Sequence, residues 1–97
     1  MEKQKQKFIV RCDRAGVFYG EIEERNGREV KMRNARCLWY WDGAATLLQL
    51  AAEGTTIANN CKFTMTVDSL EVLDAIEIIP CTEEAMESIE GVREWKR

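Results

Sequence analysis

The sequence predicts an α+β fold: a strongly bent antiparallel sheet, or a small barrel, of about six strands with two helices. Three observations lead to this class. Apolar and polar residues alternate through residues 8–41 and again from residue 62, which is the period of strands. The dipeptide Asn26-Gly27 lies between two such runs and predicts a tight hairpin. Residues 44–52 and the segment after Pro80 have helical patterns and caps instead.

The length and composition of the chain suit one globular domain. Of its 97 residues, 45% are apolar and 32% are charged. We place the domain at residues 8–97, after a flexible polar lead at residues 1–7. Only Phe8-Ile9-Val10 follows the lysines of that lead before Arg11, so we expect no secretory signal. No apolar run approaches the roughly 20 residues of a membrane span.

The first 42 residues predict a four-stranded antiparallel meander. We expect its strands at residues 8–12, 17–23, 28–33 and 36–41. Asn26 and Gly27 both tolerate positive φ, so the second connection is expected to be a type I′ turn. Asn34-Ala35 is a weaker turn signal. Gly20, within the second strand, indicates a bulge or a close backbone approach.

A helix is expected next, at residues 44–52. Asp42 is its predicted N-cap, and Gly54 is the glycine expected just past its end. The segment is apolar nearly all round, with more apolar surface than one small sheet needs for cover. We therefore expect the chain to form a homo-oligomer.

The second half predicts two strands and a final helix. A loop at 55–60 leads to a strand at 62–67, with Phe63, Met65 and Val67 inward, and Asp68-Ser69 turns the chain into a strand at 70–79 that places Ile76 and Ile78 in the core. Pro80 stops that strand, and Thr82 caps the helix. The helix has acidic residues at its start and basic residues at its end, and its inner face holds Ala85, Met86, Ile89 and Val92, with Arg93, Lys96 and Arg97 toward its negative end.

The residues that usually perform catalysis are scarce. The chain has no histidine, so a histidine general base and a Cys–His pair are both excluded. Glycine-rich phosphate loops are absent. Asp74 and Glu77 lie within an apolar strand, where each is either a buried acceptor satisfied by an arginine or a functional carboxylate. We predict that the chain is not an enzyme and carries no catalytic residues and no cofactor.

The cysteines, at positions 12, 37, 61 and 81, never form Cys-x-x-Cys. Without histidine, a zinc site would need all four thiolates to converge from distant elements. We expect free buried thiols in a reducing cytosol, and no metal. The net charge of −3 argues against nucleic-acid binding.

The stretch 36–41 is the best candidate for binding. Trp39 and Trp41 share a strand face with Cys37, and Tyr40 takes the other face. Arginines from strand ends and turns are expected near it, and arginine beside aromatic rings suits a phosphorylated planar ligand. The candidate ligand-binding residues are Arg11, Arg14, Arg33, Arg36, Trp39, Tyr40 and Trp41. The alternative is that the tryptophans belong to the core or to a subunit interface.

Two segments carry a resemblance to a known family. The runs Leu-Trp-Tyr-Trp-Asp-Gly-Ala-Ala at 38–45 and Asp-Ala-Ile-Glu-Ile-Ile-Pro-Cys-Thr-Glu-Glu-Ala at 74–85 resemble small uncharacterised proteins encoded by phages and prophages, a domain of unknown function. The resemblance covers nearly the whole chain after about residue 8. It implies a phage or prophage origin and action in the bacterial cytoplasm, and it brings no activity with it.

Three functions follow as hypotheses. The first is a phage accessory protein that binds a small phosphorylated ligand and sequesters a nucleotide signal of host defence. The alternative is a module that acts on a host protein through an aromatic surface. The third, a nucleic-acid-binding small barrel, is the weakest because the chain is acidic. Convergence of Arg11, Arg33 and Arg36 beside exposed tryptophans would favour the first, and an aromatic patch without arginines would favour the second.

Overall fold

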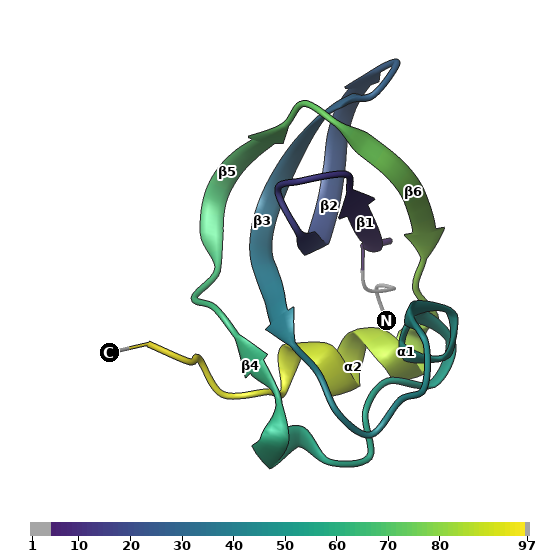
Figure 1. Ribbon diagram of the computed structural model, residues 1–97, viewed down its shortest axis with the longest axis vertical. Helices are drawn as coiled ribbons and strands as arrows, with labels where there is room; N and C mark the ends of the chain where they lie inside the picture. Colours follow the sequence, from purple (N-terminus) through teal and green to yellow (C-terminus); the bar gives the residue numbers. More distant parts are fainter. Residues whose placement is uncertain (1–4, 97) are drawn as a thin grey trace.

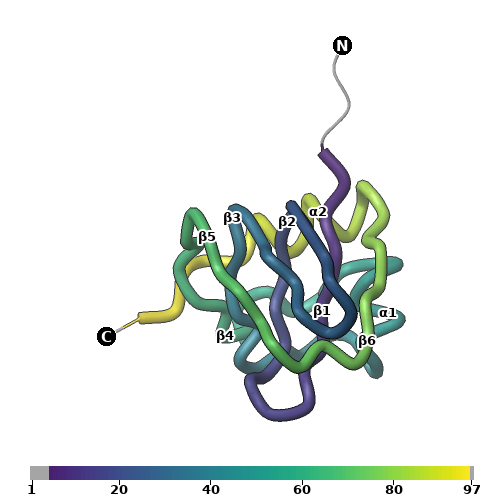
Figure 2. The backbone as a smooth tube through the Cα atoms, turned by 90° about the horizontal axis from the view of Figure 1, so that it is seen from above, coloured from purple at the N-terminus to yellow at the C-terminus, as the bar shows by residue number. Residues whose placement is uncertain are grey.

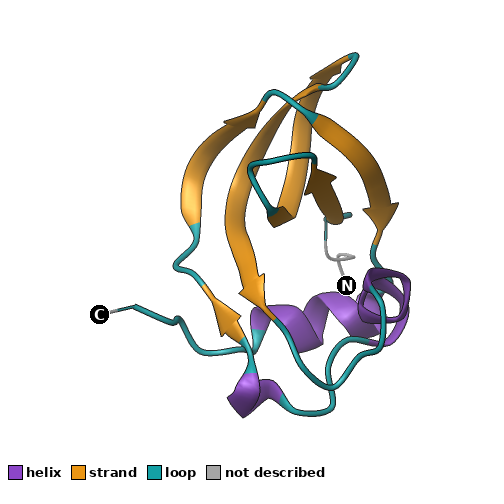
Figure 3. Cartoon of the chain, viewed as in Figure 1, coloured by secondary structure: helices purple, strands orange, loops and turns teal. Residues whose placement is uncertain are grey.

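A computed structural model describes residues 5–96 and confirms the α+β class. Six strands form an antiparallel sheet, and two helices lie against one end of it (Figures 1 and 3). Residues 1–4 of the predicted lead and Arg97 of the predicted final turn lie outside the described residues. The elements are β1 (Phe8–Cys12), β2 (Val17–Asn26), β3 (Glu29–Tyr40), α1 (Leu47–Glu53), a 3₁₀ turn (Ala58–Asn60), β4 (Lys62–Phe63), β5 (Val67–Val72), β6 (Ala75–Pro80) and α2 (Glu83–Glu90).

The sheet is strongly bent but open. Its strand order is β4-β3-β2-β1-β6, and β5 pairs with the same edge of β3 as β4 does. Figure 2 shows β5, β3, β2, β1 and β6 side by side, with α2 behind them. No pairing joins β5 to β6 within residues 5–96, so the bent sheet that we predicted is present and the closed barrel is not.

The predicted third and fourth strands are one strand, so the N-terminal meander has three strands and not four. β3 runs through Asn34-Ala35 without turning back. Asn34 has φ 51°, and the β2–β3 register shifts beside it, between Tyr19 and Glu21. These are the marks of a β-bulge, which Asn accommodates because it tolerates positive φ. Gly20 is the predicted close approach, since a Cβ there would lie 2.8 Å from the Ala35 Cα.

The β2–β3 hairpin is present, but its turn lies one residue later than expected. Asn26 still belongs to β2 and pairs with Glu29, so Gly27 and Arg28 form the two-residue loop. Gly27 has φ 63°, whereas Arg28 is not among the described residues with positive φ. Glycine with positive φ at the first loop position is the pattern of a type II′ turn, not the type I′ turn that we predicted.

The region 62–79 holds three strands where we predicted two. β4 pairs with the end of β3 at Leu38, and β5 pairs with its first half. Between them the chain leaves the ladder at residues 64–66, which exposes Met65. Val67, the first residue of β5, is also exposed, so neither side chain points inward as predicted. Ser69 pairs with Arg33 inside β5, and the turn falls at residues 73–74 instead.

Both helices differ from the prediction at their ends. Thr46, not Asp42, caps α1, because its side chain accepts a hydrogen bond from the Gln49 N–H. Asp42 accepts instead from the N–H of Gly43, whose φ of 84° turns the chain after β3. Gly54 ends α1 as expected, and Thr82 caps α2 as expected. α2 stops at Glu90, so the basic residues 93 and 96 lie beyond the helix.

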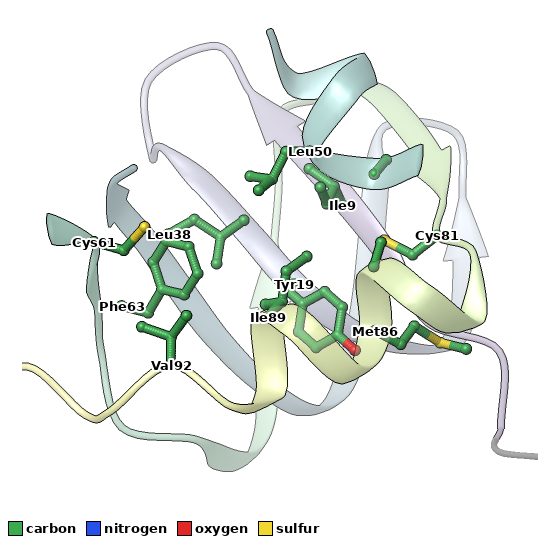
Figure 4. Close-up of a cluster of buried hydrophobic side chains, with 12 residues drawn as sticks. Ile9, Tyr19, Leu38, Leu50, Cys61, Phe63, Cys81, Met86, Ile89 and Val92 are labelled. Atoms are coloured by element: carbon green, nitrogen blue, oxygen red, sulfur yellow. The ribbon is translucent and has the colours of Figure 1, made fainter. Parts of the chain in front are cut away.

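The sheet separates two apolar clusters. The outer cluster lies between the sheet and the helices, and Figure 4 shows Phe63, Leu38, Tyr19 and Ile89 packed together there. The inner cluster lies inside the bend. It contains Val10, Cys12, Val30, Met32, Ala35, Val72 and Ala75. Ile78 packs partly against the inner cluster as predicted, whereas Ile76 is 43% exposed and outside the core.

Candidate functional site

Among the described residues, Arg36 is the charged residue whose side chain is buried, with 5% of its surface exposed. It lies on the outer side of β3, beneath the end of α2. Its Nε donates to the Thr64 carbonyl at 2.9 Å, and its Nη2 donates to the Phe63 carbonyl at 3.2 Å. Its Nη1 donates to the carbonyls of Ile89 and Val92 at 3.0 and 3.1 Å. Burial lowers the pKa of the guanidinium.

These contacts give Arg36 a structural role, in holding the fold together. Four of its five N–H donors bind main-chain carbonyls, and the guanidinium lies 5.4 Å from the centre of the Phe63 ring. The carbonyls belong to β4, to the residue after it, and to the end of α2. Arg36 thereby supplies donors to carbonyls at a two-residue strand and at a helix end, and it is the donor to the carbonyls of Thr64 and Val92.

The other predicted arginines lie apart from Arg36, each in its own setting. Arg11 on β1 forms an ion pair with Glu77 at 2.9 Å, and Arg33 on β3 forms one with Glu23 at 3.3 Å. β2 separates the two strands. Arg14 is exposed in the β1–β2 turn, where its backbone N–H donates to Asp74. Glu77 therefore has the arginine partner that we predicted, although it is half-buried.

The tryptophans, unlike the predicted arginines, include a pair of rings that contact each other at the surface. Trp39 is 61% exposed, and its ring stacks on Trp95 with the centroids 5.0 Å apart and the planes at 27°. The Lys62 Nζ lies 5.7 Å from the Trp39 ring and 5.5 Å from the Trp95 ring. We call Trp39, Lys62 and Trp95 the tryptophan stack. Tyr40 is exposed on the other face of the strand, and Trp41 packs partly buried against the outer cluster.

The segment after α2 holds Trp95 in place. The Trp95 N–H donates to the Phe63 carbonyl at 2.8 Å, and Glu94 forms a parallel bridge with Phe63. Val92 is buried just before them. Sequence reasoning missed Trp95, because a lone aromatic residue in a charged terminal segment carries no period. The signal available was only that a third tryptophan lay among the charged residues at the end of the predicted final helix.

A cavity of 370 Å³ adjoins the tryptophan stack on the Trp95 side. Its lining comes from the 3₁₀ turn and the segment after α2, namely Ala58, Asn59, Cys61, Gly91, Arg93, Glu94 and Trp95. Arg93 is exposed, and within residues 5–96 it forms no ion pair. The stack and the cavity together offer flat aromatic surface beside a recess with a cation at its wall.

A second polar group lies under α2, next to Arg36. The Tyr19 hydroxyl donates to Glu90 Oε2 at 2.5 Å, and Lys7 Nζ lies 2.8 Å from the same oxygen. Burial, together with the hydrogen bond to Glu90, raises the pKa of Tyr19. The phenol therefore stays protonated at neutral pH and acts as a hydrogen-bond donor that fixes α2 to β2.

The four cysteines are free thiols. Burial is the main cause that raises the pKa of Cys12 to about 11 and that of Cys81 to about 12, and it also raises the pKa of Cys37. Protonated thiols are poor nucleophiles and poor metal ligands. Within residues 5–96, no three side chains of the metal-ligating acidic and cysteine types lie close enough together to hold an ion.

Fold and site together define a small α+β domain that presents an ordered aromatic surface to solvent. The chain belongs to the family described as Domain of unknown function (DUF6948), whose model matches residues 5–89. Membership of an uncharacterised family, predicted from the segments at 38–45 and 74–85, is thereby confirmed. Trp39 and Lys62 fall inside the matched range, and Trp95 falls outside it.

Comparison with curated proteins gave no match, and comparison with solved structures gave none either. Among the described residues, no helix combines the length and the apolar character needed to cross a membrane.

Proposed function

We propose that this chain is a non-enzymatic accessory protein of a phage or prophage that binds a host protein through the tryptophan stack. The observation that carries the proposal is the exposure of Trp39 while its ring is fixed against Trp95. An exposed apolar surface held in one orientation is typical of protein interfaces, in which tryptophan is enriched at the residues that dominate affinity. The phage origin and the action in the bacterial cytoplasm rest on the resemblance of residues 38–45 and 74–85.

The arrangement of the arginines supports a protein partner over a phosphorylated ligand. A nucleotide site would need arginines beside the aromatic rings. Arg36 is engaged by main-chain carbonyls, and Arg11 and Arg33 are paired with glutamates on separate strands. The cation beside the rings is Lys62. Arg93 lines the cavity next to Trp95, but Arg11, Arg33 and Arg36 do not converge on the tryptophan stack, and this separation favours the host-protein hypothesis.

The absence of enzymatic activity belongs to the same proposal. The sequence contains no histidine, and the raised pKa values of Cys12 and Cys81 keep these thiols protonated at neutral pH.

The cavity beside Trp95 suits the binding of a partner's side chain. Its 370 Å³ accommodates one large side chain of a partner, with Arg93 at the wall for a carboxylate or a carbonyl.

The test is a binding comparison between matched variants. Tagged wild-type chain, Trp39→Ala and Leu48→Ala would each be used to capture partners from a bacterial lysate. Leu48 on α1 is 62% exposed, so its variant removes a similar apolar side chain from another surface. We expect a protein retained by wild type and by Leu48→Ala but lost from Trp39→Ala. The purified pair should then bind with a shift in tryptophan emission.

Two outcomes would contradict the proposal. One is a captured protein that Trp39→Ala retains at wild-type level, because the stack would then be unnecessary for binding. The other is a stoichiometric nucleotide found with the purified chain by native mass spectrometry, which would restore the phosphorylated-ligand hypothesis.

A homo-oligomer stays a prediction, resting on α1. Leu48 is 62% exposed and Leu47 is half-buried, so the helix leaves apolar surface uncovered within one chain. We expect light scattering at micromolar concentration to give a mass above that of one chain, and Leu48→Glu to reduce it to one chain because a buried carboxylate without a partner is costly. A single-chain mass for the wild type would contradict the prediction.

A further inference from the structure

The strand β6 lies at the edge of the sheet, and its second side is open. Within residues 5–96, β1 is the strand that pairs with it (Figure 2). The Cys81 N–H donates to the Lys7 carbonyl at 3.0 Å, which sets the alternation of the ladder. Counting back from Cys81, alternate residues of β6 therefore bond to β1. Ile78 lies between two of these residues, so its N–H and C=O point to the open side of β6.

This edge has few of the features that normally block strand addition. Three of its six residues are isoleucines, its charged residue Glu77 is paired with Arg11, and Pro80 stands only at its end. The opposite edge strand, β5, carries Asp68 and Glu71 instead. An apolar, β-branched edge with an open backbone is a template for another strand.

The open side of β6 faces a recess closed at one end by the β2–β3 hairpin. The Ala75 N–H donates to the Arg28 carbonyl at 3.0 Å, which holds the hairpin tip at the start of β6 (Figure 1). The recess has a volume of 660 Å³. Its lining residues are Arg25, Gly27, Arg28, Ala75, Ile76, Glu77 and Ile78.

The recess carries positive charge. The Arg25 side chain donates to the Gly27 carbonyl at 3.1 Å, and the Arg28 side chain donates to the Ala75 carbonyl at 3.4 Å. Within residues 5–96 neither arginine is in an ion pair. Because Arg11 offsets Glu77, two arginine charges remain uncompensated at the end of an open strand edge.

We propose that β6 accepts an extended acidic segment of a partner protein as an additional strand. The backbone of the segment would pair with the N–H and C=O of Ile78, and its carboxylates would bind Arg25 and Arg28. Complementary charge selects this occupant over a neutral strand. The site is separate from the tryptophan stack, because Arg28 comes just before the start of β3 and Trp39 lies at the end of that strand. It therefore stands whether or not the stack binds a host protein.

The probe for the test is a short fluorescein-labelled peptide of alternating valine and glutamate, measured by fluorescence anisotropy. We expect it to bind the wild type and to slow hydrogen exchange of the Ile78 amide. The double variant Arg25→Glu, Arg28→Glu should bind at least about tenfold more weakly, because both charge contacts become repulsive. The matched control, Arg14→Glu with Arg33→Glu, makes the same charge change at two other exposed arginines, outside both the recess and the tryptophan stack, and should bind as the wild type does.

A second peptide separates strand pairing from simple charge attraction. Methylation of alternate backbone nitrogens removes the peptide's donors and leaves its carboxylates unchanged, so we expect binding to be lost. Equal binding of the methylated peptide would overturn the proposal, as would equal binding by both double variants or no binding to the wild type. A dimer of the chain that pairs through β6 and excludes the peptide would overturn the assigned occupant.

Discussion

On the face of the sheet that the helices cover, the buried side chains include an arginine with four main-chain partners. On the inner face, every buried side chain of the cluster is apolar. Arg36 and Met32 show the difference within one strand. Arg36 binds two carbonyls near β4 and two at the end of α2, whereas Met32 is fully buried among valines, alanines and a cysteine.

The difference shows how short elements are held in place. α2 has eight residues and β4 has two, so each supplies only a few side chains to the outer cluster. Directional hydrogen bonds from Arg36 attach β4 and the end of α2 to the sheet, and one from Tyr19 attaches α2. The position of Trp95 depends on the same bonds, because Arg36 binds the Val92 carbonyl just before it. The stability of the outer face and the geometry of the tryptophan stack are therefore coupled.

The largest effect is expected from Arg36→Met, which keeps most of the side-chain volume and removes every donor. The carbonyls of Thr64 and Val92 would lose their donor, whereas those of Phe63 and Ile89 keep a backbone N–H, so we expect a loss of about 4 kcal/mol in the free energy of unfolding. Urea denaturation measures it. Arg33→Met, next to the bulge residue Asn34 and half-exposed, should cost less than about 0.5 kcal/mol. Equal losses of stability in the two variants would show that the hydrogen bonds of Arg36 do not stabilise the packing of β4 and α2 on the sheet.

Met32→Ala should act differently on the inner face. Truncating a fully buried side chain leaves a cavity, and we expect a loss of about 3 kcal/mol. Hydrogen exchange sharpens the comparison. Met32→Ala should lower protection evenly over β1, β2 and β3, whereas Arg36→Met should first release α2 and β4. Met65→Ala, at an exposed site, is the matched control and should change stability little.

Tyr19→Phe should cost less, about 1.5 kcal/mol, because the ring keeps its packing and only the hydrogen bond to Glu90 is lost. Thermal or urea unfolding measures the change, with Tyr40→Phe at an exposed site as the control. No loss in Tyr19→Phe would mean that the hydroxyl contributes nothing to docking α2.

The smallest effect concerns acid stability at the bulge. The hydrogen bond from Asn34 Nδ2 is the main cause that lowers the pKa of Glu21 from its ordinary value of 4.5. The folded pKa is thus below the unfolded one, so the contribution is complete above pH 4.5 and is lost as the pH falls through the folded value. Asn34→Gly keeps the positive φ and removes the bond.

In that variant we expect the Glu21 pKa to move upward, and the stability to depend less on pH in the acid range. Lys5, 3.2 Å from the carboxylate, would still hold the pKa somewhat low. An NMR titration of the Glu21 carboxyl carbon checks this, and an unchanged pKa would refute the assigned cause.

The sequence was sufficient for the class of fold and for most strands, because alternation reports which face is buried. It was insufficient at Asn34, where a turn and a bulge require the same positive φ and only the pairing of β2 distinguishes them. It was also insufficient at residues 62–67, because alternation does not show that the chain changes partner along β3.

The candidate site was predicted only in part. Trp39 was identified from its place on a strand, but its partner Trp95 is 56 positions away and joins it through a bridge with β4. The sequence pattern predicts Arg36 as a ligand-binding residue, because an arginine next to aromatic residues looks the same in sequence whether it faces solvent or a helix end. Its burial depends on where α2 ends, and no local pattern records that.

Photo-crosslinking in living bacteria tests the central claim most directly. A benzophenone amino acid would replace Trp39 in one variant and Leu48 in another, and irradiation would join each to whatever lies against it. We predict that position 39 gives a discrete crosslink to one host protein and that position 48 does not give the same product. No crosslink at position 39, or the same products at both positions, would contradict the assignment of the tryptophan stack as the binding surface.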